Sequence, residues 1–388
     1  MNAYKRFCLF LPDYSAVKTL KMKKFIKAGL IVYLLFPVNY LTKGQMPYTR
    51  ESWQYIATKM PDEWYGSEES KTIAENVLLY QRDLGGWPKN IAVHKPLTET
   101  EKARIKDEKG LNDAIFDNSA TTTEMKFLAK MYNSTNNQVY KDSFNKGLKF
   151  VLDAQYKNGG WPMFYPLRKG YYTHITFNDN AIVNILDMLR DIGEKKTQYS
   201  SITSPKLMAR IKKAYKKGID CILKTQIIVN GKPTVWCAQH DEKTLLPAKA
   251  RSYELPSFSG QESADIVKLL MKIKNPSPEI ISSVTGAIEW FETHRIKNTR
   301  WEYFTDSDGN RDRRIIHDPE ADDLWARFYD LETEQPYVCD RDGIKKEILE
   351  EISYERRNNY SWYTDAPRDV IDKYPVWRAK WQKMITEK

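Results

Sequence analysis

Apolar residues recur at helical spacing in a unit that occurs three times along the chain. Each copy runs from a helical stretch into a Gln, a glycine-containing turn and a Trp, and then into a second helical stretch. The three tryptophans, Trp87, Trp161 and Trp236, lie 74 and 75 residues apart. A fixed period of this length indicates one supersecondary unit that is used repeatedly. The pattern therefore predicts three helical hairpins.

The second helix of each unit has a polar start followed by an apolar stripe. In the first copy the stripe comprises Met125, Leu128, Ala129 and Tyr132, at positions i, i+3, i+4 and i+7. No single hairpin can bury such a stripe, but three hairpins packed side by side can. We therefore expect an all-α dominated fold, an (α/α)3 toroid of three helical hairpins. This arrangement would place the three polar helix starts at one end of the ring.

The fourth segment departs from this pattern and predicts a smaller strand-containing C-terminal part. A helix over residues 275–300 is followed by Trp301 to Asn310, which is typical of a strand and a turn. Three aspartates around Gly309 resemble part of a calcium-binding loop, but no liganding Glu follows at the right distance. We expect a solvated hairpin turn there.

The N-terminal residues 1–45 are predicted to be a leader and not part of the fold. Four lysines precede the uncharged run 28–36, which suits a signal-peptide core and is too short to span a bilayer. Met22 is a plausible true start. We expect a secreted or periplasmic protein with no stable membrane span after leader removal, and one domain over residues 46–388. An uncleaved anchor and a cytosolic protein are the alternatives.

Removal of the leader changes the charge balance. The whole chain has a formal net charge of +10, but residues 1–45 hold eight Lys or Arg and one Asp, which leaves 53 basic and 50 acidic residues. No basic stripe interleaved with aromatic residues is present, so we expect no nucleic-acid partner. Three cysteines remain, and Cys221 and Cys237 could form a disulfide or stay as buried thiols.

The polar helix starts carry the candidate chemistry. Asp117, Asp179 and Glu262 are, taken singly, ordinary capping acids at helix N-termini. However, Asp117-Asn118 and Asn178-Asp179 occupy matching places in neighbouring units and should converge. Clustered Asp and Asn oxygens suit a hard cation such as Ca²⁺. Two acids at one mouth could equally be the acid and base of a glycosidase.

A loop before the third polar start contributes basic residues. Lys249 and Arg251 lie two apart in a segment bounded by Pro247 and Pro256. Side chains two apart in an extended chain point to the same side. We expect both to face the carboxylate cluster, although a salt-bridged surface loop is the simpler interpretation of each residue alone.

Several phrases in the chain resemble the pectate lyases of polysaccharide lyase family ten. They are GGWPKN, FDNSATTTEM, GGWPMFYP, ITFNDNA, ARSYELPSFSGQES and LWARFY with a following RDG, in this order over residues 50–365. The resemblance implies a toroid of three α-hairpins and calcium-assisted β-elimination of polygalacturonate. Glu254-Leu255-Pro256 and Tyr337 to Asp340 depart from the family's more common wording.

The resemblance also implies roles for individual residues. Arg251 matches the family's proposed catalytic base, and Asp117 would share the catalytic centre. Asp179, Asn118 and Asp117 would hold Ca²⁺. Arg327 and Arg341 would bind substrate carboxylates, for which the planar fork of arginine is well shaped. Lys249 and His174 would make further subsite contacts.

Arginine is almost always protonated, so a basic Arg251 needs help from nearby cations and burial, which would lower its pKa. Three other functions remain open: a toroidal glycoside hydrolase using Asp117 and Asp179, a non-catalytic pectin-binding protein, and a helical-toroid terpene cyclase. The last suits the chain poorly because Asp322-Asp323 is too short for the required acidic motif. We expect a monomer.

Overall fold

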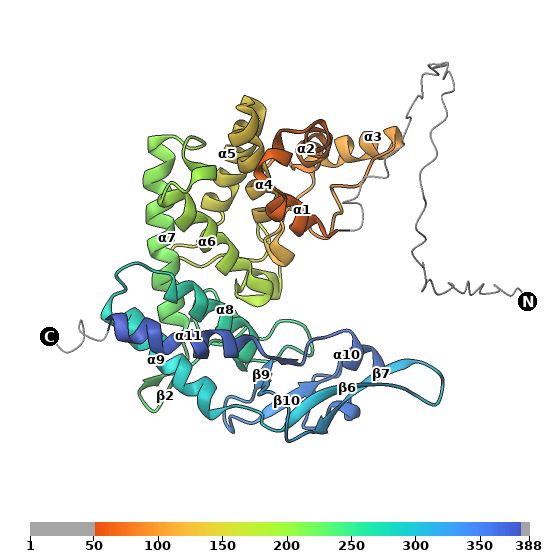
Figure 1. Ribbon diagram of the computed structural model, residues 1–388, viewed down its shortest axis with the longest axis vertical. Helices are drawn as coiled ribbons and strands as arrows, with labels where there is room; N and C mark the ends of the chain where they lie inside the picture. The colour runs from red at the N-terminus through yellow and green to blue at the C-terminus, as the bar shows by residue number, and fades with distance from the viewer. Residues whose placement is uncertain (1–50, 382–388) are drawn as a thin grey trace, which may run out of the picture. The chain divides into compact units, whose positions relative to one another are not determined.

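Helices before and after each repeated Trp form two rows in the structure, a computed structural model that describes residues 51–381 (Figure 1). These residues belong to one compact unit, Tyr48–Lys388. The predicted leader, with Met22 and Cys8, lies outside the described residues. Within residues 51–381, no helix is both long and apolar enough to cross a membrane.

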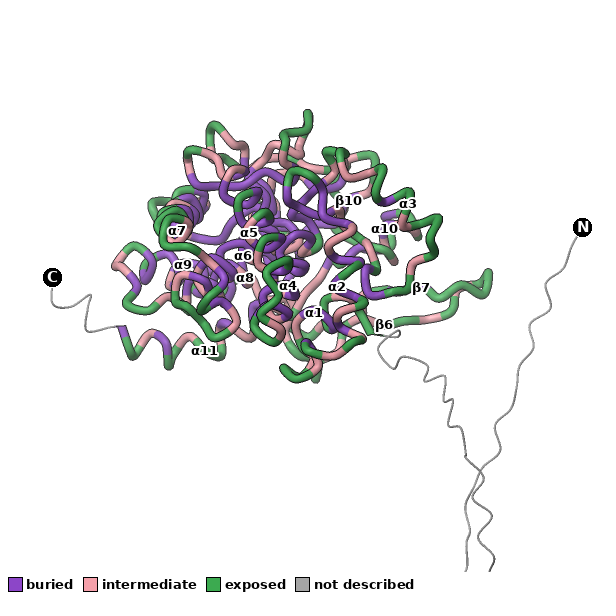
Figure 2. The backbone as a smooth tube through the Cα atoms, turned by 90° about the horizontal axis from the view of Figure 1, so that it is seen from above, coloured by how far each residue is buried: buried purple, intermediate pink, exposed green. Residues whose placement is uncertain are grey.

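The helices that precede the Trp residues form one row, and the helices that follow them form the other. The first row is α2 (Glu68–Tyr80), α5 (Gln138–Asp153), α7 (Pro205–Thr225) and α9 (Pro278–Thr293). The second row is α4 (Thr122–Thr135), α6 (Ala181–Gly193), α8 (Gly260–Met271) and α11 (Ala366–Trp381). In the second row each helix contacts the next, and α5, α7 and α9 do the same. Figure 2 shows that α6 and α8 are largely buried, whereas α7 and α11 carry exposed stretches. The helical hairpins expected from the sequence are therefore confirmed.

The repeated Trp ties each loop to the helix before it. Trp87, Trp161 and Trp236 are fully buried, and their indole nitrogens donate to the carbonyls of Val77, Val151 and Ile222 at 2.7–2.8 Å. Burial of an indole is most favourable when its N–H finds a partner. The Gln side chain of each phrase donates to two backbone carbonyls, one in its own loop and one in a neighbouring helix. Gln81 Nε2, for example, donates to the carbonyl of Gly85 in its loop and to that of Ser143 in α5.

A fourth copy of this contact is present and was missed in the sequence. Trp325 is buried, and its indole donates to the carbonyl of Phe291 at the end of α9, at 2.8 Å. It lies 89 residues after Trp236 because the β6–β7 hairpin is inserted between α9 and this Trp. The insertion breaks the period, and no Gly-Gly precedes Trp325, so no matching phrase marks this copy in the sequence.

The glycines of the first two phrases are required by backbone conformation and by space. Gly85 and Gly159 have φ of 109° and 101°. A Cβ on Gly85 would lie 2.4 Å from the Lys146 carbonyl oxygen, and one on Gly159 would lie 2.0 Å from that of Lys217. Only glycine combines this φ with so close an approach. Each loop therefore packs directly against the next helix of the first row, which is α5 for Gly85 and α7 for Gly159.

Short strands complete the fold and link neighbouring units. The strands are β1 (Ile175–Thr176), β2 (Ile228–Val229), β3 (Lys232–Pro233), β4 (Gln239–His240), β5 (Phe258–Ser259), β6 (Thr299–Thr305), β7 (Arg311–His317), β8 (Trp325–Ala326), β9 (Phe328–Tyr329), β10 (Pro336–Cys339), β11 (Lys345–Lys346) and β12 (Tyr363–Thr364). All pairs among them are antiparallel, and the largest sheet has the order β11-β10-β9-β5. The β6–β7 hairpin is largely exposed in Figure 2.

The predicted hairpin turn between β6 and β7 is confirmed. Asp306 Oδ1 accepts from the backbone N–H groups of Asp308 and Asn310, and Gly309 has a φ of 81°. The three remaining cysteines, Cys221, Cys237 and Cys339, are buried and free, so no disulfide joins the first two. Burial raises the pKa of Cys221 to about 12, which keeps it as an unreactive thiol.

Backbone hydrogen bonds connect the polar start of each unit to the Trp loop of the next. Phe116 N–H donates to Met163, Phe177 N–H to Ala238, and Gly260 N–H to Arg327, at 2.9–3.1 Å. Each acceptor lies two residues after a repeated Trp, so Arg327 occupies in the fourth unit the place of Met163 and Ala238. This shared register gathers the polar starts at one end of the helices, as expected from the sequence.

Candidate active site

Two matching turns place the acidic residues. Asp117–Ser119 (η4) and Asn178–Asn180 (η6) are single 3-10 turns that contact each other, just before α4 and α6. Asn118 and Asp179 are equivalent, with φ of 51° and 49°. The residues that follow them, Ser119 and Asn180, are also left-handed. Consecutive left-handed non-glycine residues cost of order 1–3 kcal/mol each and tend to occur at functional sites.

The capping interpretation of the acids is wrong for the first two units. Neither turn shows a side-chain cap hydrogen bond, and Thr121, the N-cap residue of α4, has none either. Glu124 instead accepts a hydrogen bond from the indole of Trp53, at 2.7 Å. In the third unit Ser259 does cap α8 by accepting from Glu262 N–H. The carboxylates of Asp117 and Asp179 therefore do not cap these helices.

Asp117 is buried with one oxygen satisfied. Its Oδ2 forms an ion pair with Lys89, while its Oδ1 is buried without a hydrogen-bond partner in the described structure. A buried carboxylate oxygen without a partner is unfavourable, so it indicates a missing ligand or ion. The neighbouring Asn118 donates to Asn90 Oδ1 at 2.9 Å, which leaves its own carbonyl oxygen available.

Asp179 lies beside Asp117, and the neighbouring charges affect its protonation. Burial raises the pKa of Asp179 to about 6; Arg327 opposes this shift, whereas Asp117 and Glu262 reinforce it. Carboxylates this close cannot both ionise cheaply unless a cation separates them.

Arg327 forms the floor of the site. Its Nη2 contacts Asn178 Oδ1 at 2.8 Å and Glu262 Oε1 at 2.5 Å, and it lies 3.7 Å from Asp179 Oδ1. Burial disfavours its charge, but the nearby Glu262 outweighs this and raises the pKa of Arg327 above its usual range. Arg327 is therefore a permanent cation under the acid cluster.

Arg251 is held by Glu254, three residues further along the same loop. Its Nε and Nη2 contact the two carboxylate oxygens at 2.9 and 2.8 Å, a bidentate pair. Burial lowers the pKa of Arg251, but the hydrogen bond and charge of Glu254 outweigh burial and raise it. Without a bound metal, Glu254 dominates the surroundings of Arg251, so the expected lowering of this pKa by neighbouring cations stays a prediction for the calcium-bound cleft.

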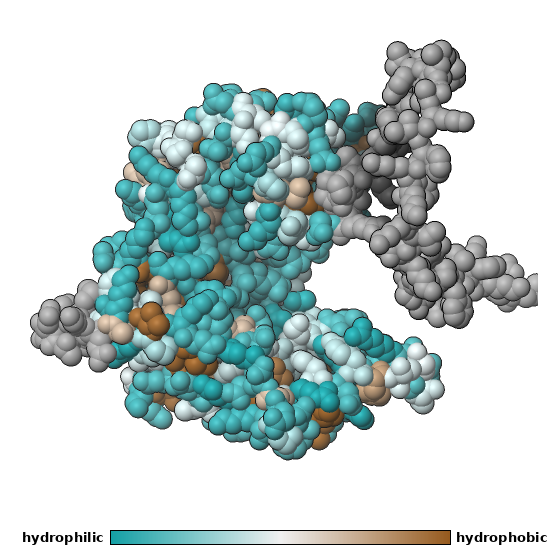
Figure 3. Space-filling view, in the orientation of Figure 1, coloured by the Kyte–Doolittle hydropathy of each residue, from teal (hydrophilic) through white to brown (hydrophobic). Residues whose placement is uncertain are grey.

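These groups line two adjoining cavities of about 500 and 490 Å³, which share Asn118, Asp179, Arg327 and Ser361. One cavity also contains Gln261 and Glu262, and the other contains Lys89, Asp117 and Arg251. The face seen in Figure 3 has a hydrophilic recess between the helices of the first units and the strand-containing part. The cluster is thus an open, polar cleft suited to an extended polar ligand.

Three predicted substrate-binding residues lie outside these cavities. Lys249 is exposed near Gly343 and does not line either cavity with Arg251. Arg341 is exposed and pairs with Glu355, although its guanidinium lies 5.9 Å from the Tyr253 ring, which Arg251 also approaches. His174 faces Asp241 and Glu242. Arg327, the fourth predicted residue, lies in both cavities.

Several lining residues were missed in the sequence. Lys89 pairs with Asp117 and lies two residues after Trp87, as Arg327 lies two after Trp325, so the repeat itself could have indicated it. Arg313 on β7 lines the cavity that contains Arg251. Its guanidinium donates to the carbonyls of Arg357 and Tyr360, and burial lowers its pKa. No sequence signal connected the inserted hairpin with this site.

The oxygen donors of the cleft fit a hard divalent cation. Asp117 Oδ1 lacks a partner, Asp179 is a strained acid beside it, and the Asn118 amide oxygen lines the same cavity. Carboxylate and amide oxygens are the ligands that Ca²⁺ prefers, and a cation would relieve the repulsion between the two acids.

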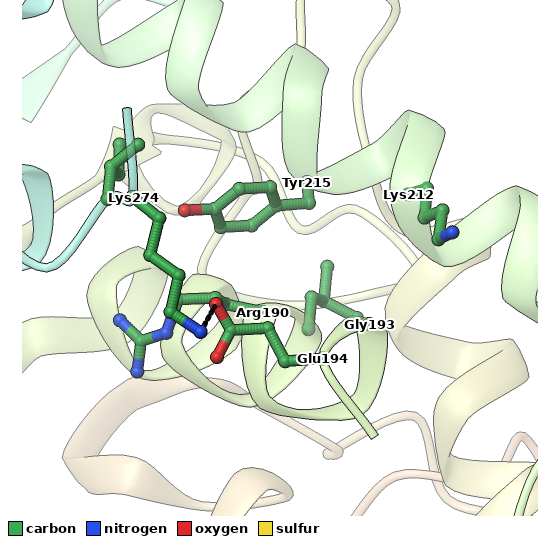
Figure 4. A pocket seen from close by; sticks show the side chains of 8 residues that line it. Arg190, Gly193, Glu194, Lys212, Tyr215 and Lys274 are labelled. Carbon is green, nitrogen blue, oxygen red and sulfur yellow. Dashed lines mark ion pairs between the residues drawn. The ribbon is translucent and has the colours of Figure 1, made fainter. Parts of the chain in front are cut away.

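A further cavity of about 230 Å³ lies between the C-terminal end of α6 and the middle of α7, and none of the acid-cluster residues lines it (Figure 4). Three of the four charged side chains that line it are already paired: Lys274 contacts Glu194 at 3.3 Å, and Arg190 is held by Asp187 and Asp191. Such solvated pairs at helix ends are ordinary surface features. The cavity lacks the unsatisfied acids of the cleft and is not the candidate site.

Comparison with known proteins identifies the family of the chain. A family model described as pectic acid lyase matches residues 81–371. A mutant of the family 10 polysaccharide lyase from Cellvibrio cellulosa, solved in complex with trigalacturonic acid, is 35% identical, with a TM-score of 0.71 over 82% of this chain and 94% of that chain. The family 10 lyase from the same organism is 34% identical, with a TM-score of 0.67 over 81% and 97%. No curated protein sequence matches significantly. The chain therefore belongs to the pectic acid lyase family and is a polysaccharide lyase.

Proposed function

We propose that the cleft cleaves α-1,4-linked polygalacturonate by calcium-assisted β-elimination. The observation that carries this proposal is the convergence of Asp117, Asn118 and Asp179, from two strained turns, opposite Arg251 and Arg327 in one polar cleft. The related lyase from Cellvibrio cellulosa was solved with trigalacturonic acid, which supports a galacturonan ligand here.

The chemistry follows from the substrate. The C5 proton of a galacturonate residue lies α to the carboxylate and is only weakly acidic. When it leaves, its electron pair forms the C4–C5 double bond, the C4–O4 bond breaks, and O4 departs with the leaving chain and takes a proton from water. A bound Ca²⁺ would supply positive charge beside the uronate carboxylate, where negative charge develops.

The protein residues have distinct tasks in this proposal. Asp117, Asp179 and Asn118 would hold the cation. Arg251 is the proposed acceptor of the C5 proton, which requires its bidentate pair with Glu254 to open when substrate arrives. Arg327 is held in place by Glu262 and Asn178, so its positive charge offsets the negative charge of the acid cluster throughout the reaction. Asp117 orients the centre through its ion pair with Lys89.

Residues outside the two cavities are proposed for more distant contacts with the polymer. Lys249 and Arg341 are exposed cations on the same side as Tyr253 and suit carboxylates of neighbouring sugars. We further propose that the protein is exported, secreted or periplasmic, and acts as a monomer without a nucleic-acid partner. These proposals rest on the basic-then-apolar N-terminal sequence and on the nearly balanced charge of residues 46–388.

The decisive experiment measures ultraviolet absorbance and reducing sugar together. Polygalacturonate is incubated with the mature protein at alkaline pH, with calcium and with a chelator. Rising absorbance that the chelator stops supports the proposal, because the C4–C5 double bond is conjugated with the carboxylate. Reducing ends without absorbance would instead indicate a hydrolase that uses Asp117 and Asp179. Binding without either signal would indicate a non-catalytic pectin-binding protein.

A further inference from the structure

We propose a second metal site, formed by His174, Asp241 and Glu242, that binds a borderline divalent cation such as Zn²⁺. One ligand atom from each of the three side chains lies within 4.8 Å of the others. None of the three lines the cleft cavities. The site is therefore distinct from the oxygen cluster of Asp117 and Asp179.

The backbone ladder fixes two of the three ligands opposite each other. β1 pairs with β4 so that Ile175 faces His240. His174 directly precedes β1 and Asp241 directly follows β4, so they occupy the next position of the same antiparallel ladder. Facing residues in such a ladder have Cβ atoms about 5 Å apart. The short distance between their ligand atoms is thus a property of the fold and not of side-chain placement alone.

An unsatisfied imidazole nitrogen points to a missing ligand. His174 Nδ1 is buried and has no hydrogen-bond partner within residues 51–381. Buried polar atoms in folded proteins are almost always paired. The carboxylates beside it could satisfy this nitrogen only through a bound proton or a bound ion.

The two carboxylates are also free of cationic partners. No Lys or Arg ion pair to Asp241 or Glu242 occurs in the described part of the chain. Asp241 uses Oδ1 to accept three hydrogen bonds from Lys243 and Thr244, which leaves Oδ2 available. Thr173 Oγ1 donates to Glu242 Oε2 at 3.2 Å. Such outer hydrogen bonds orient ligands around a metal.

The ligand types select the metal. Zn²⁺ accepts an imidazole nitrogen together with carboxylate oxygens in a four-coordinate site, in which water would take the fourth position, whereas Ca²⁺ prefers six to eight oxygens. A metal here would brace β1 against the start of the loop that carries Lys249 and Arg251. That loop returns to β4, because Ala248 N–H donates to Gln239 at 3.0 Å. We therefore assign the site a structural role.

The test measures Zn²⁺ binding to the full chain by calorimetry, without substrate. An Asp179→Asn background removes a ligand of the cleft, so that any remaining binding reports the second site. We expect one Zn²⁺ per chain in this background and a higher melting temperature when Zn²⁺ is added. Asp241→Asn and Glu242→Gln should each weaken Zn²⁺ binding by about 100-fold or more, since each removes a ligand charge and loss of even an outer hydrogen-bond partner costs roughly 10–100-fold.

Controls separate this site from weak surface binding. Asp220→Asn makes the same chemical change at an exposed carboxylate of α7 and should leave Zn²⁺ affinity unchanged. Both ligand substitutions keep an oxygen that accepts the existing hydrogen bonds, and circular dichroism verifies their fold. Co²⁺ bound in place of Zn²⁺ should show the visible absorption of a four-coordinate site. Equal Zn²⁺ affinity in Asp241→Asn, Glu242→Gln and the background would overturn the proposal, as would no binding in the background.

Discussion

Arg327 Nη2 and Glu262 Oε1 lie 2.5 Å apart in the interior, and both side chains are almost fully buried. Removal of one partner from a buried pair leaves an uncompensated charge. We expect Arg327→Ala to lower the free energy of unfolding by about 3–5 kcal/mol, measured by urea denaturation. Arg341→Ala, at an exposed arginine that also pairs with a Glu, should change it by less than about 1 kcal/mol. Equal effects of the two substitutions would contradict this account.

Asp179 gives a prediction about stability and pH. Its pKa is raised from 3.8 to about 6, so the folded state binds its proton more tightly than the unfolded chain does. The contribution of this group is most favourable below pH 4 and is lost as the pH rises through 6. Without added cation, Asp179→Asn should therefore raise stability at pH 7 by on the order of 1 kcal/mol, after allowance for its exposure of about one third.

Thermal unfolding at pH 4 and pH 7, with Asp220→Asn as the matched control, measures this effect. The gain from Asp179→Asn should be larger at pH 7, and turnover should be lost in the same variant. Calcium should stabilise the parent more than Asp179→Asn, because one ligand is missing. A loss of stability of Asp179→Asn at pH 7 without cation would show that the ionised Asp179 does not destabilise the folded state.

Arg251→Ala should reduce polygalacturonate cleavage by several orders of magnitude while substrate binding largely survives. The control is Arg210→Ala, because Arg210 has a similar exposure and pairs with Asp153 at the same 2.8 Å. Absorbance at saturating substrate measures cleavage, and calorimetry with a galacturonate oligomer measures binding. Nearly normal cleavage by Arg251→Ala would exclude it as the proton acceptor.

Glu254→Gln tests how Arg251 is tuned. Glu254 raises the pKa of Arg251, so neutralising it should lower that pKa and make the unprotonated guanidine available at lower pH. The alkaline rise of the rate should shift toward lower pH. Glutamine retains an acceptor for the Tyr360 hydroxyl, which donates to Glu254 at 2.7 Å. Glu347→Gln, at an exposed carboxylate, should leave the pH profile unchanged. An unshifted profile in Glu254→Gln would show that the rate does not depend on the protonation of Arg251.

Two glycine substitutions separate backbone strain from steric overlap. Gly159 and Gly170 both have positive φ, of 101° and 91°, but only Gly159 faces a close atom, the Lys217 carbonyl oxygen at 2.0 Å from an added Cβ. Gly170→Ala should cost about 1 kcal/mol from strain alone. Gly159→Ala should cost roughly 3 kcal/mol, because the loop must also move off α7. Chemical denaturation of both variants measures the difference.

The sequence predicted the helical units because their apolar stripes and Gly-Gly-Trp phrases repeat at fixed spacing. It predicted the acid cluster because Asp117-Asn118 and Asn178-Asp179 hold matching places in two copies. The fourth unit was missed because the β6–β7 insertion separates Trp325 from the period. The sequence also did not predict the geometry of the loop that carries Lys249 and Arg251. These residues are two apart, but a turn from Arg251 to Glu254 places only Arg251 in the cleft. Ion pairs such as Arg251–Glu254, which set the pKa, depend on side-chain placement that no local pattern encodes.

The register that joins each unit to the next has a consequence for cooperativity. The first unit supplies Lys89 and Asp117 to the cleft, the second supplies Asp179, the third supplies Glu262, and the fourth supplies Arg327. No fragment that lacks one unit can assemble the complete centre. A ligand bound there would couple the folding of all four units, since binding to the native state alone stabilises every segment that forms the site. Catalytic activity would then require all four units to be folded at the same time.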